Sequence, residues 1–133
     1  MKKMASSEVQ HTILNVIKDE KSLKLFNAIA RIGGKSKNIS PELDLSHKEY
    51  YTRLSKLITA GLVKRNGGKY TLTALGTIVY ETQLILRKAV AIYWKLNAID
   101  AIESSGQIGE QERVKLIKTI VNDEDIERVL LKT

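Results

Sequence analysis

The sequence predicts a mainly α-helical fold with one small β-hairpin, and three observations lead to this class. Apolar residues recur at helical spacing through most of the chain. Residues 62–72 read as two short β-prone runs separated by Asn66-Gly67-Gly68, and Asn and Gly tolerate the positive φ of a tight turn. Residues 74–104 repeat isoleucine every seven positions, which indicates a long helix. At 133 residues, the chain is long enough for one domain with a modest core.

Two helices are predicted before residue 33. Ser6 or Ser7 is expected to cap the first, whose apolar face comprises Val9, Ile13, Val16 and Ile17. Asp19 or Ser22 is expected to cap the second, which runs to about Arg31 and faces inward through Leu25, Phe26, Ile29 and Ile32. Gly33-Gly34 should end that helix, because glycine readily adopts the left-handed conformation of a helix stop.

A third helix is predicted over 46–60, before the hairpin. A short helix with Pro41 at its first position and a turn at Asp44-Leu45 should precede it. Ser46 and Glu49 have the spacing of a capping box, in which each side chain bonds the other residue's N–H. The inward face comprises Tyr50, Leu54, Leu57 and Ile58, and Ala60-Gly61 should stop the helix.

One helix of roughly 45 Å is predicted from about Ala74 to about Ser104, opened by Thr73 or Thr71. Its heptad positions are Ile78, Ile85, Ile92 and Ile99, together with Thr82, Ala89 and Leu96. A second apolar stripe comprises Leu75, Val79, Leu86 and Tyr93. Ser104-Ser105-Gly106 should end this helix. A further amphipathic helix over 109–121 and a last turn or two after Asn122-Asp123 complete the chain.

The charge is unevenly distributed. The chain has a net charge of +7, from 22 Lys and Arg against 15 Asp and Glu. Residues 1–96 carry +10 and residues 97–133 carry −3, while residues 31–69 alone hold nine cations and three acids. A basic body suits a polyanionic partner. The acidic end is either a separate association segment or an ordinary solvated helix.

Several function classes are not expected. The chain has no cysteine, which excludes disulfides and thiolate metal sites, and its histidines, His11 and His47, lie far apart without a metal-ligand pattern. No apolar run approaches the roughly 18 residues of a membrane span, and no signal peptide is apparent, so a cytoplasmic, nucleoid-associated protein is expected. No acid, His or Ser combination has catalytic spacing, and no phosphate-binding loop is present. We therefore expect neither an enzyme nor a cofactor or metal site.

A helix followed by a basic hairpin is the layout of a winged helix-turn-helix, which makes double-stranded DNA the expected partner. The N-terminal half of the 46–60 helix should read major-groove base edges, and the wing over 64–69 should contact phosphates or the minor groove. The candidate DNA contacts are Lys35, Lys37, His47, Lys48, Tyr51, Thr52, Arg53, Ser55, Lys56, Lys64, Arg65, Asn66 and Lys69. The alternative is an ordinary solvated helix face and a hairpin whose lysines prevent edge aggregation. Tyr51 could instead pack against the preceding helix.

The run from Leu45 to Val63 resembles the reading helix of the MarR and ArsR regulator classes, through Ser46, Leu54, Leu57 and Gly61-Leu62-Val63. Residues 69–76 resemble the strand-to-helix junction of small archaeal winged-helix regulators, with its Y-x-L-T-x-x-G pattern. The resemblance implies a homodimeric, DNA-binding transcriptional regulator whose long helix builds the dimer. The metal-sensing cysteines of ArsR proteins and the Asp-Arg wing motif of MarR proteins have no counterpart here.

The predicted organisation is an N-terminal helix over 1–20, a DNA-binding domain over 21–76, a dimerisation helix over 74–104 and a helical segment over 105–133. The dimer seam is predicted at Ile78, Ile85, Ala89, Ile92, Leu96 and Ile99. The alternative for this helix is an intramolecular core element wrapped by 7–18 and 109–131. A dimeric regulator would bind half-sites roughly 34 Å apart. The other functions considered are a non-specific architectural DNA binder and a winged-helix protein-interaction module. An effector ligand is not predictable.

Overall fold

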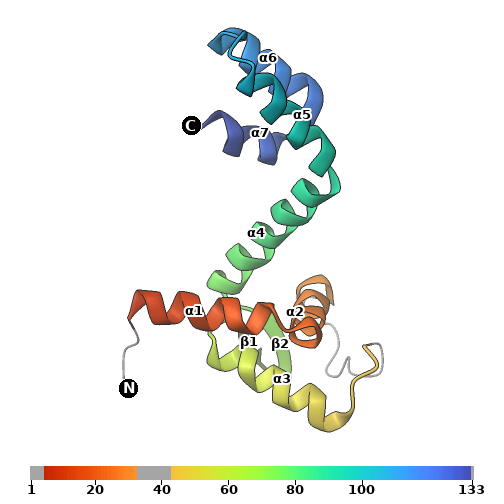
Figure 1. Cartoon of the computed structure of the whole chain (residues 1–133). Helices are drawn as coiled ribbons and strands as arrows, with labels where there is room; N and C mark the ends of the chain where they lie inside the picture. The colour runs from red at the N-terminus through yellow and green to blue at the C-terminus, as the bar shows by residue number, and fades with distance from the viewer. Residues whose placement is uncertain (1–4, 33–42, 133) are drawn as a thin grey trace. The chain divides into compact units, whose positions relative to one another are not determined.

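The computed structural model describes residues 5–32 and 43–132. Within these ranges it contains seven helices and one two-stranded antiparallel sheet (Figure 1), so a mainly helical fold with a hairpin is confirmed. The chain divides into two compact units, Met1–Tyr80 and Glu81–Thr133. Predictions for residues 33–42, which include the Gly33-Gly34 stop, the short helix at Pro41, Lys35 and Lys37, lie outside the described residues.

Three helices and the hairpin build the first unit. The helices are α1 (Ser6–Ile17), α2 (Glu20–Ile32) and α3 (His47–Thr59). The apolar faces predicted for these helices meet in one core, whose most buried members are Leu25, Phe26, Tyr50, Leu54, Leu57, Leu62 and Val63. Ile58 differs from the prediction: it is 41% exposed, because the buried face of α3 is narrower than its apolar stripe.

The helix caps follow the sequence signals with one correction. Ala5, not Ser6 or Ser7, is the N-cap of α1 and provides no side-chain bond, because both serines already lie within the helix. Asp19 caps α2 as predicted: its carboxylate accepts hydrogen bonds from the Ser22 N–H at 3.3 Å and the Ser22 hydroxyl at 2.6 Å. Ser46 caps α3 and accepts the Glu49 N–H at 3.1 Å. The turn before α3 is also present, with Asp44 at a φ of 54°.

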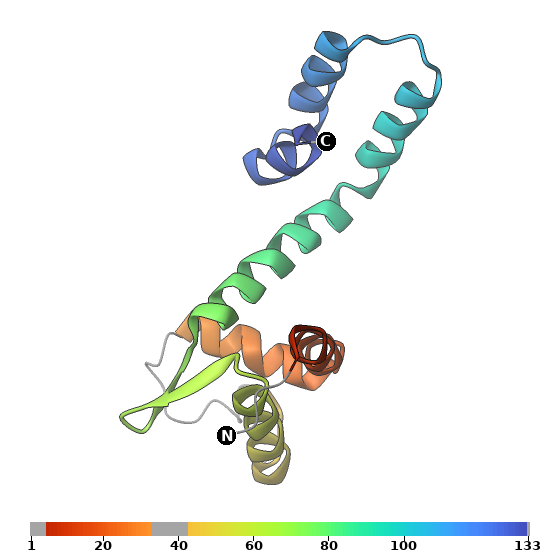
Figure 2. The same cartoon turned by 90° about the vertical axis from the view of Figure 1, so that its left-hand side faces the viewer.

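The hairpin pairs β1 (Val63–Asn66) with β2 (Lys69–Leu72) in antiparallel register, from Val63 opposite Leu72 to Asn66 opposite Lys69. Gly67 and Gly68 form the two-residue turn with φ of 60° and 81°. A turn with two positive φ values matches the right-handed twist of the strands. The tip of the hairpin projects beyond the helices of this unit (Figure 2).

A close backbone approach fixes the junction between the hairpin and α4 (Ala74–Ala91). The Thr73 hydroxyl donates to the Gly61 carbonyl at 2.6 Å and accepts the Gly76 N–H at 2.9 Å. A Cβ at Gly76 would lie 2.0 Å from the Leu62 carbonyl oxygen. Only glycine fits at this contact, which gives a structural reason for threonine and glycine three positions apart at this junction.

The predicted single helix over 74–104 is wrong, because α4 ends at Ala91 and α5 (Tyr93–Ser104) begins after Ile92. Ile92 has a φ of −111° and a ψ of 28°, and its N–H is shared between the carbonyls of Lys88 and Ala89 at 3.3 and 3.2 Å. Residues 90–94 contain β-branched and aromatic residues, which have lower helix propensity than Ala or Leu. The apolar repeat continues through the break, so periodicity alone does not reveal it.

The second unit closes with α6 (Glu110–Val121) and α7 (Glu124–Leu131). Its core consists of Ile99, Ile117, Val121 and Ile126, with partly buried neighbours on the adjoining helices. Asn122 has a φ of 51°, and Asp123 caps α7 by accepting the N–H groups of Asp125 and Ile126 at 3.0 and 3.1 Å. The predicted break at Asn122-Asp123 is therefore confirmed.

Five of the six residues predicted for the dimer seam pack into this core within one chain: Ile85, Ala89, Ile92, Leu96 and Ile99. The sixth, Ile78, lies in the first unit and is 64% exposed. The intramolecular alternative for this helix is therefore observed at five positions, through packing with the 109–131 segment.

Candidate nucleic-acid interface

The polar face of α3 is exposed along its whole length. The predicted contacts His47, Lys48, Tyr51, Thr52, Ser55 and Lys56 all belong to this exposed set. Their opposite side is anchored by Tyr50, Leu54 and Leu57, which are at most 2% exposed. A helix held so firmly on one side presents its polar side chains at fixed positions.

Two ion pairs join the start of α2 to this helix. Lys21 pairs with Glu49, and Arg53 Nε lies 3.2 Å from Asp19 Oδ2. Glu49 and Arg53 are four residues apart, so the two pairs hold consecutive turns of α3. The hydrogen bond from Lys21 lowers the pKa of Glu49, and the Ser46 N–H and hydroxyl act in the same direction. The orientation of α3 thus depends on charges on α2 as well as on apolar packing.

Arg53 differs from the other predicted contacts on α3. Its side chain is only 19% exposed, and it lies against the same carboxylate that caps α2. The Ser22 hydroxyl lowers the pKa of Asp19 most, and the Arg53 charge lowers it further, so Asp19 is ionised near neutral pH. A phosphate would have to compete with Asp19 for this guanidinium. Arg53 is better placed to position α3 than to contact DNA directly.

An aromatic cluster lies at the N-terminal half of α3. Tyr51 stacks on His47 with ring centroids 6.1 Å apart, and it meets the buried Tyr50 edge-on at 5.0 Å. Tyr51 is nevertheless 53% exposed, so it does not simply pack against the preceding helix. The rings of His47 and Tyr50 therefore contact the Tyr51 ring within the face predicted to read bases.

The hairpin tip places cations on both of its faces. Lys64, Arg65, Asn66 and Lys69 are all exposed. Paired residues in an antiparallel hairpin share a face, and successive residues alternate, so Lys64 and Lys69 lie on one face and Arg65 lies on the other. Of the eleven predicted DNA contacts within the described residues, ten are exposed, and Arg53 is the exception.

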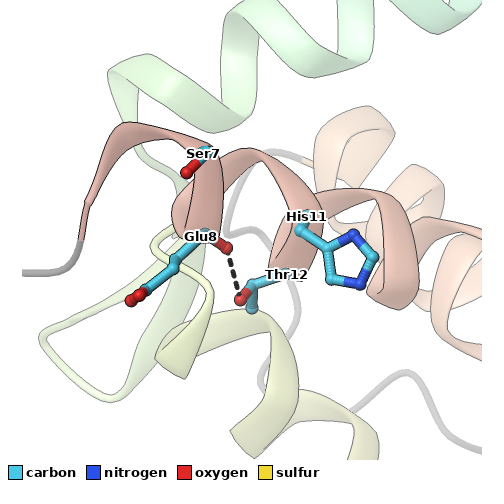
Figure 3. A pocket seen from close by; sticks show the side chains of 4 residues that line it. All are labelled: Ser7, Glu8, His11 and Thr12. Carbon is cyan, nitrogen blue, oxygen red and sulfur yellow. Dashed lines mark hydrogen bonds between the residues drawn. The ribbon is translucent and has the colours of Figure 1, made fainter.

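Other parts of the described structure offer weaker sites. A shallow surface hollow is lined by Ser7, Glu8, His11 and Thr12, all from α1 (Figure 3), and the Thr12 hydroxyl is already bonded to the Glu8 carbonyl at 2.8 Å. Among residues 5–32 and 43–132, no three His, Asp or Glu side chains gather as metal ligands would. In the same ranges, no helix is long and apolar enough to cross a membrane.

Sequence reasoning did not identify Asp19 and Lys21 as the residues that hold α3. The sequence predicts Asp19 only as a helix cap, and it predicts no role for Lys21. The spacing of Glu49 and Arg53 was visible in the sequence. Their partners lie 28 and 34 positions earlier, and local patterns do not report contacts at that separation.

Neither a protein-family model, a curated protein nor a solved structure matches this chain.

Proposed function

We propose that this protein is a homodimeric, winged helix-turn-helix regulator of transcription that binds double-stranded DNA. Helix α3 enters the major groove, and the β1–β2 hairpin contacts phosphates or the minor groove beside it. Association with the nucleoid follows from such binding. The observation that carries the proposal is the combination of a firmly packed helix with an exposed polar face and an exposed hairpin tip bearing three cations.

The chemistry of the α3 face suits base recognition. Lys48 can donate to guanine O6 and N7, and Thr52 can bond a base or contact a thymine methyl group. Their polar groups reach outward from the first two turns, the part of a reading helix that normally lies deepest in the groove. Arg53 has no direct contact in this proposal, since Asp19 engages it.

The hairpin cations suit the DNA backbone. Lys64, Arg65 and Lys69 surround a two-glycine turn and are distributed over both faces of the hairpin. Such a tip can neutralise phosphates on either side of a narrow groove, which supplies affinity without reading sequence.

The test is fluorescence anisotropy of the full chain with duplex pools and random duplex, across a salt series. A specific regulator should retain particular duplexes roughly 10³-fold or more tightly than random duplex. Equal, steeply salt-dependent binding to every duplex would instead support an architectural DNA binder. Absence of binding at low salt would overturn the proposal and leave a protein-interaction module.

A matched pair of variants assigns the reading face. Lys48→Ala with Thr52→Ala should reduce the preference for the selected duplex about 30-fold, if each contact contributes about 1 kcal/mol. Lys115→Ala with Thr119→Ala is the control, because these residues have the same types and spacing on α6 and are also exposed. Equal losses in both variants would refute the assignment of α3 as the reading helix.

A further inference from the structure

An exposed apolar surface lies within the second unit, on the side of the long helical segment that its core leaves uncovered. Leu86 and Val90 at the end of α4 are 64% and 66% exposed, and Tyr93 and Trp94 at the start of α5 are 66% and 68% exposed. We refer to these four residues as the 86–94 surface. Isolated exposed apolar residues are common, but four large ones within nine positions form a patch that needs an explanation.

The packing of the unit shows that its own helices do not cover this surface. The other apolar stripe, which includes Ile85, Ile92 and Leu96, is partly buried and packs against the core of this unit. Leu86 and Val90 are four residues apart on α4, which puts them on one side of that helix, and the exposed Tyr93 and Trp94 follow directly after the break at Ile92. The two stripes therefore differ: the stripe with Ile85, Ile92 and Leu96 packs against the core of the unit, and the 86–94 surface faces solvent.

We infer that the 86–94 surface is the homodimer interface and that a second copy of this chain covers it in an antiparallel, two-fold arrangement. The inference deepens the proposed function by naming the surface of its dimer. It places the dimer interface outside the heptad isoleucines, because most of these isoleucines are already packed in the core of a single chain.

The area fits a second copy. Four large apolar side chains, each about two-thirds exposed, present on the order of 500 Å² per chain. A two-fold interface counts this surface twice, giving roughly 1,000 Å², which is the lower limit for a specific protein–protein interface. Contacts at the rim would add to this value.

The order of residues is also self-complementary. An antiparallel, two-fold pairing of the 86–94 segments centred on Val90 sets Val90 against its copy. It also sets Leu86 at the end of α4 against Trp94 at the start of α5 of the second copy, because the positions of each pair average 90. The same register sets Arg87 opposite Tyr93, a cation and an aromatic ring that attract each other. Within one chain, Lys95 Nζ already lies 5.7 Å from the centre of the Trp94 ring, so the edge of the surface is suited to such contacts.

The first test is the association state. Sedimentation velocity or light scattering from about 1 to 200 µM should give twice the chain mass of 14.9 kDa at the higher concentrations, as expected for a small interface. Leu86→Gln with Val90→Gln should be monomeric throughout, with unchanged helix content because both side chains are exposed. A monomeric wild-type chain at 200 µM, or a dimeric double variant, would overturn the inference.

A matched control is available in the same chain. Leu14→Gln with Val129→Gln removes one leucine and one valine that are 53% and 54% exposed but lie on α1 and α7, outside the surface. This variant should remain dimeric. Loss of the dimer in both double variants would show a general response to surface polarity and would contradict the specific interface.

Cross-linking tests the register. Because the chain has no cysteine, Val90→Cys introduces a single thiol near the expected two-fold axis, and mild oxidation should give a disulfide-linked dimer. Val129→Cys should cross-link far less at equal concentration. If Val129→Cys cross-links as readily as Val90→Cys, the proposed surface is wrong. DNA binding is measured separately. A dimer that does not bind DNA refutes the DNA binding of the proposed function and leaves this inference standing. A DNA-binding monomer refutes this inference and the homodimer of the proposed function, but not its DNA binding.

Discussion

The two units of this protein expose opposite kinds of surface. Residues 1–80 hold 14 Lys and Arg against 6 Asp and Glu, and the lysines of α3 and the cations of the hairpin face outward. Residues 81–133 hold 8 against 9, and their distinctive exposed feature is the apolar 86–94 surface. Exposed cations favour a polyanion, whereas exposed apolar side chains favour a protein surface. This difference is the basis for proposing DNA binding by the first unit and association with another copy of the chain by the second.

The cores of the two units differ as well. Among residues 5–32 and 43–80, eleven buried apolar residues form the first core, which includes the fully buried Leu25, Phe26, Leu57 and Leu62. The second core has four: Ile99, Ile117, Val121 and Ile126. Because burial of apolar area is the main stabilising contribution, the second unit should gain more from an added partner than the first.

Gly76→Ala, in the first unit, is expected to change the free energy of unfolding most. A Cβ there would lie 2.0 Å from the Leu62 carbonyl oxygen, so the backbone at the start of α4 must shift. We expect a loss of about 3 kcal/mol in the free energy of unfolding, measured by urea denaturation. Thr77→Ala, one position away on the exposed side, should change stability by less than about 0.5 kcal/mol. Similar values for both variants would contradict the close approach.

Removal of the hairpin cations should weaken duplex binding by the first unit and leave the association of the second unit unchanged. Lys64→Ala, Arg65→Ala and Lys69→Ala together should reduce the salt dependence of duplex binding, with the slope of log K against log salt decreasing by up to about 3. The oligomeric state should not change, because these residues lie outside the 86–94 surface. Anisotropy titrations at several salt concentrations measure the slope, and an unchanged slope would exclude the hairpin from the interface.

Asp123→Ala should affect the second unit more than the first. The Asp123 carboxylate caps α7 and lies 3.3 Å from Lys88 Nζ, so its loss leaves the first N–H groups of α7 without a side-chain acceptor. We expect lower amide-exchange protection in α6 and α7, with protection in α2 and α3 unchanged. Asp123→Asn, which can still cap the helix, should restore most of it. Equal loss across both units would show that they unfold together.

Acid should destabilise both units through their capping carboxylates. The Ser22 hydroxyl lowers the pKa of Asp19, and the Ile126 N–H lowers that of Asp123, each from an ordinary value of 3.8. A lowered folded-state pKa stabilises the protein above 3.8, and this contribution is lost as pH falls through the folded-state value. Urea midpoints between pH 6 and pH 2 should therefore fall more steeply in the wild type than in Asp19→Asn with Asp123→Asn.

The smallest expected effect is that of Arg53→Gln on salt dependence. Because Asp19 already engages Arg53, the slope of duplex binding against salt should stay within error of the wild type, although affinity falls slightly as α3 loses one of its ion pairs. A slope lower by about 0.9 would instead identify Arg53 as a phosphate contact. The slope measured for Lys56→Ala, a variant on the exposed side of α3, is the value with which the slope of Arg53→Gln is compared.

The sequence by itself determined the features that depend on neighbouring residues. The Ser46 cap, the stop at Ala60-Gly61, the glycine turn of the hairpin and the Asn122-Asp123 break all arise from side chains or backbone angles within a few positions. The exposed face of α3 followed from helical periodicity in the same way. Such signals are local, so they can be predicted without knowledge of the tertiary structure.

Only the tertiary structure decided which apolar stripe is covered, where the long helix breaks and what Arg53 contacts. Ile92 and Leu96 pack against a core completed by helices that begin at Glu110 and Glu124, and Arg53 meets the carboxylate that caps the preceding helix. Two stripes with similar composition are equivalent in sequence until a neighbouring element buries one of them. Burial depends on contacts between distant segments, and this physical dependence made five of the six predicted seam residues part of the core.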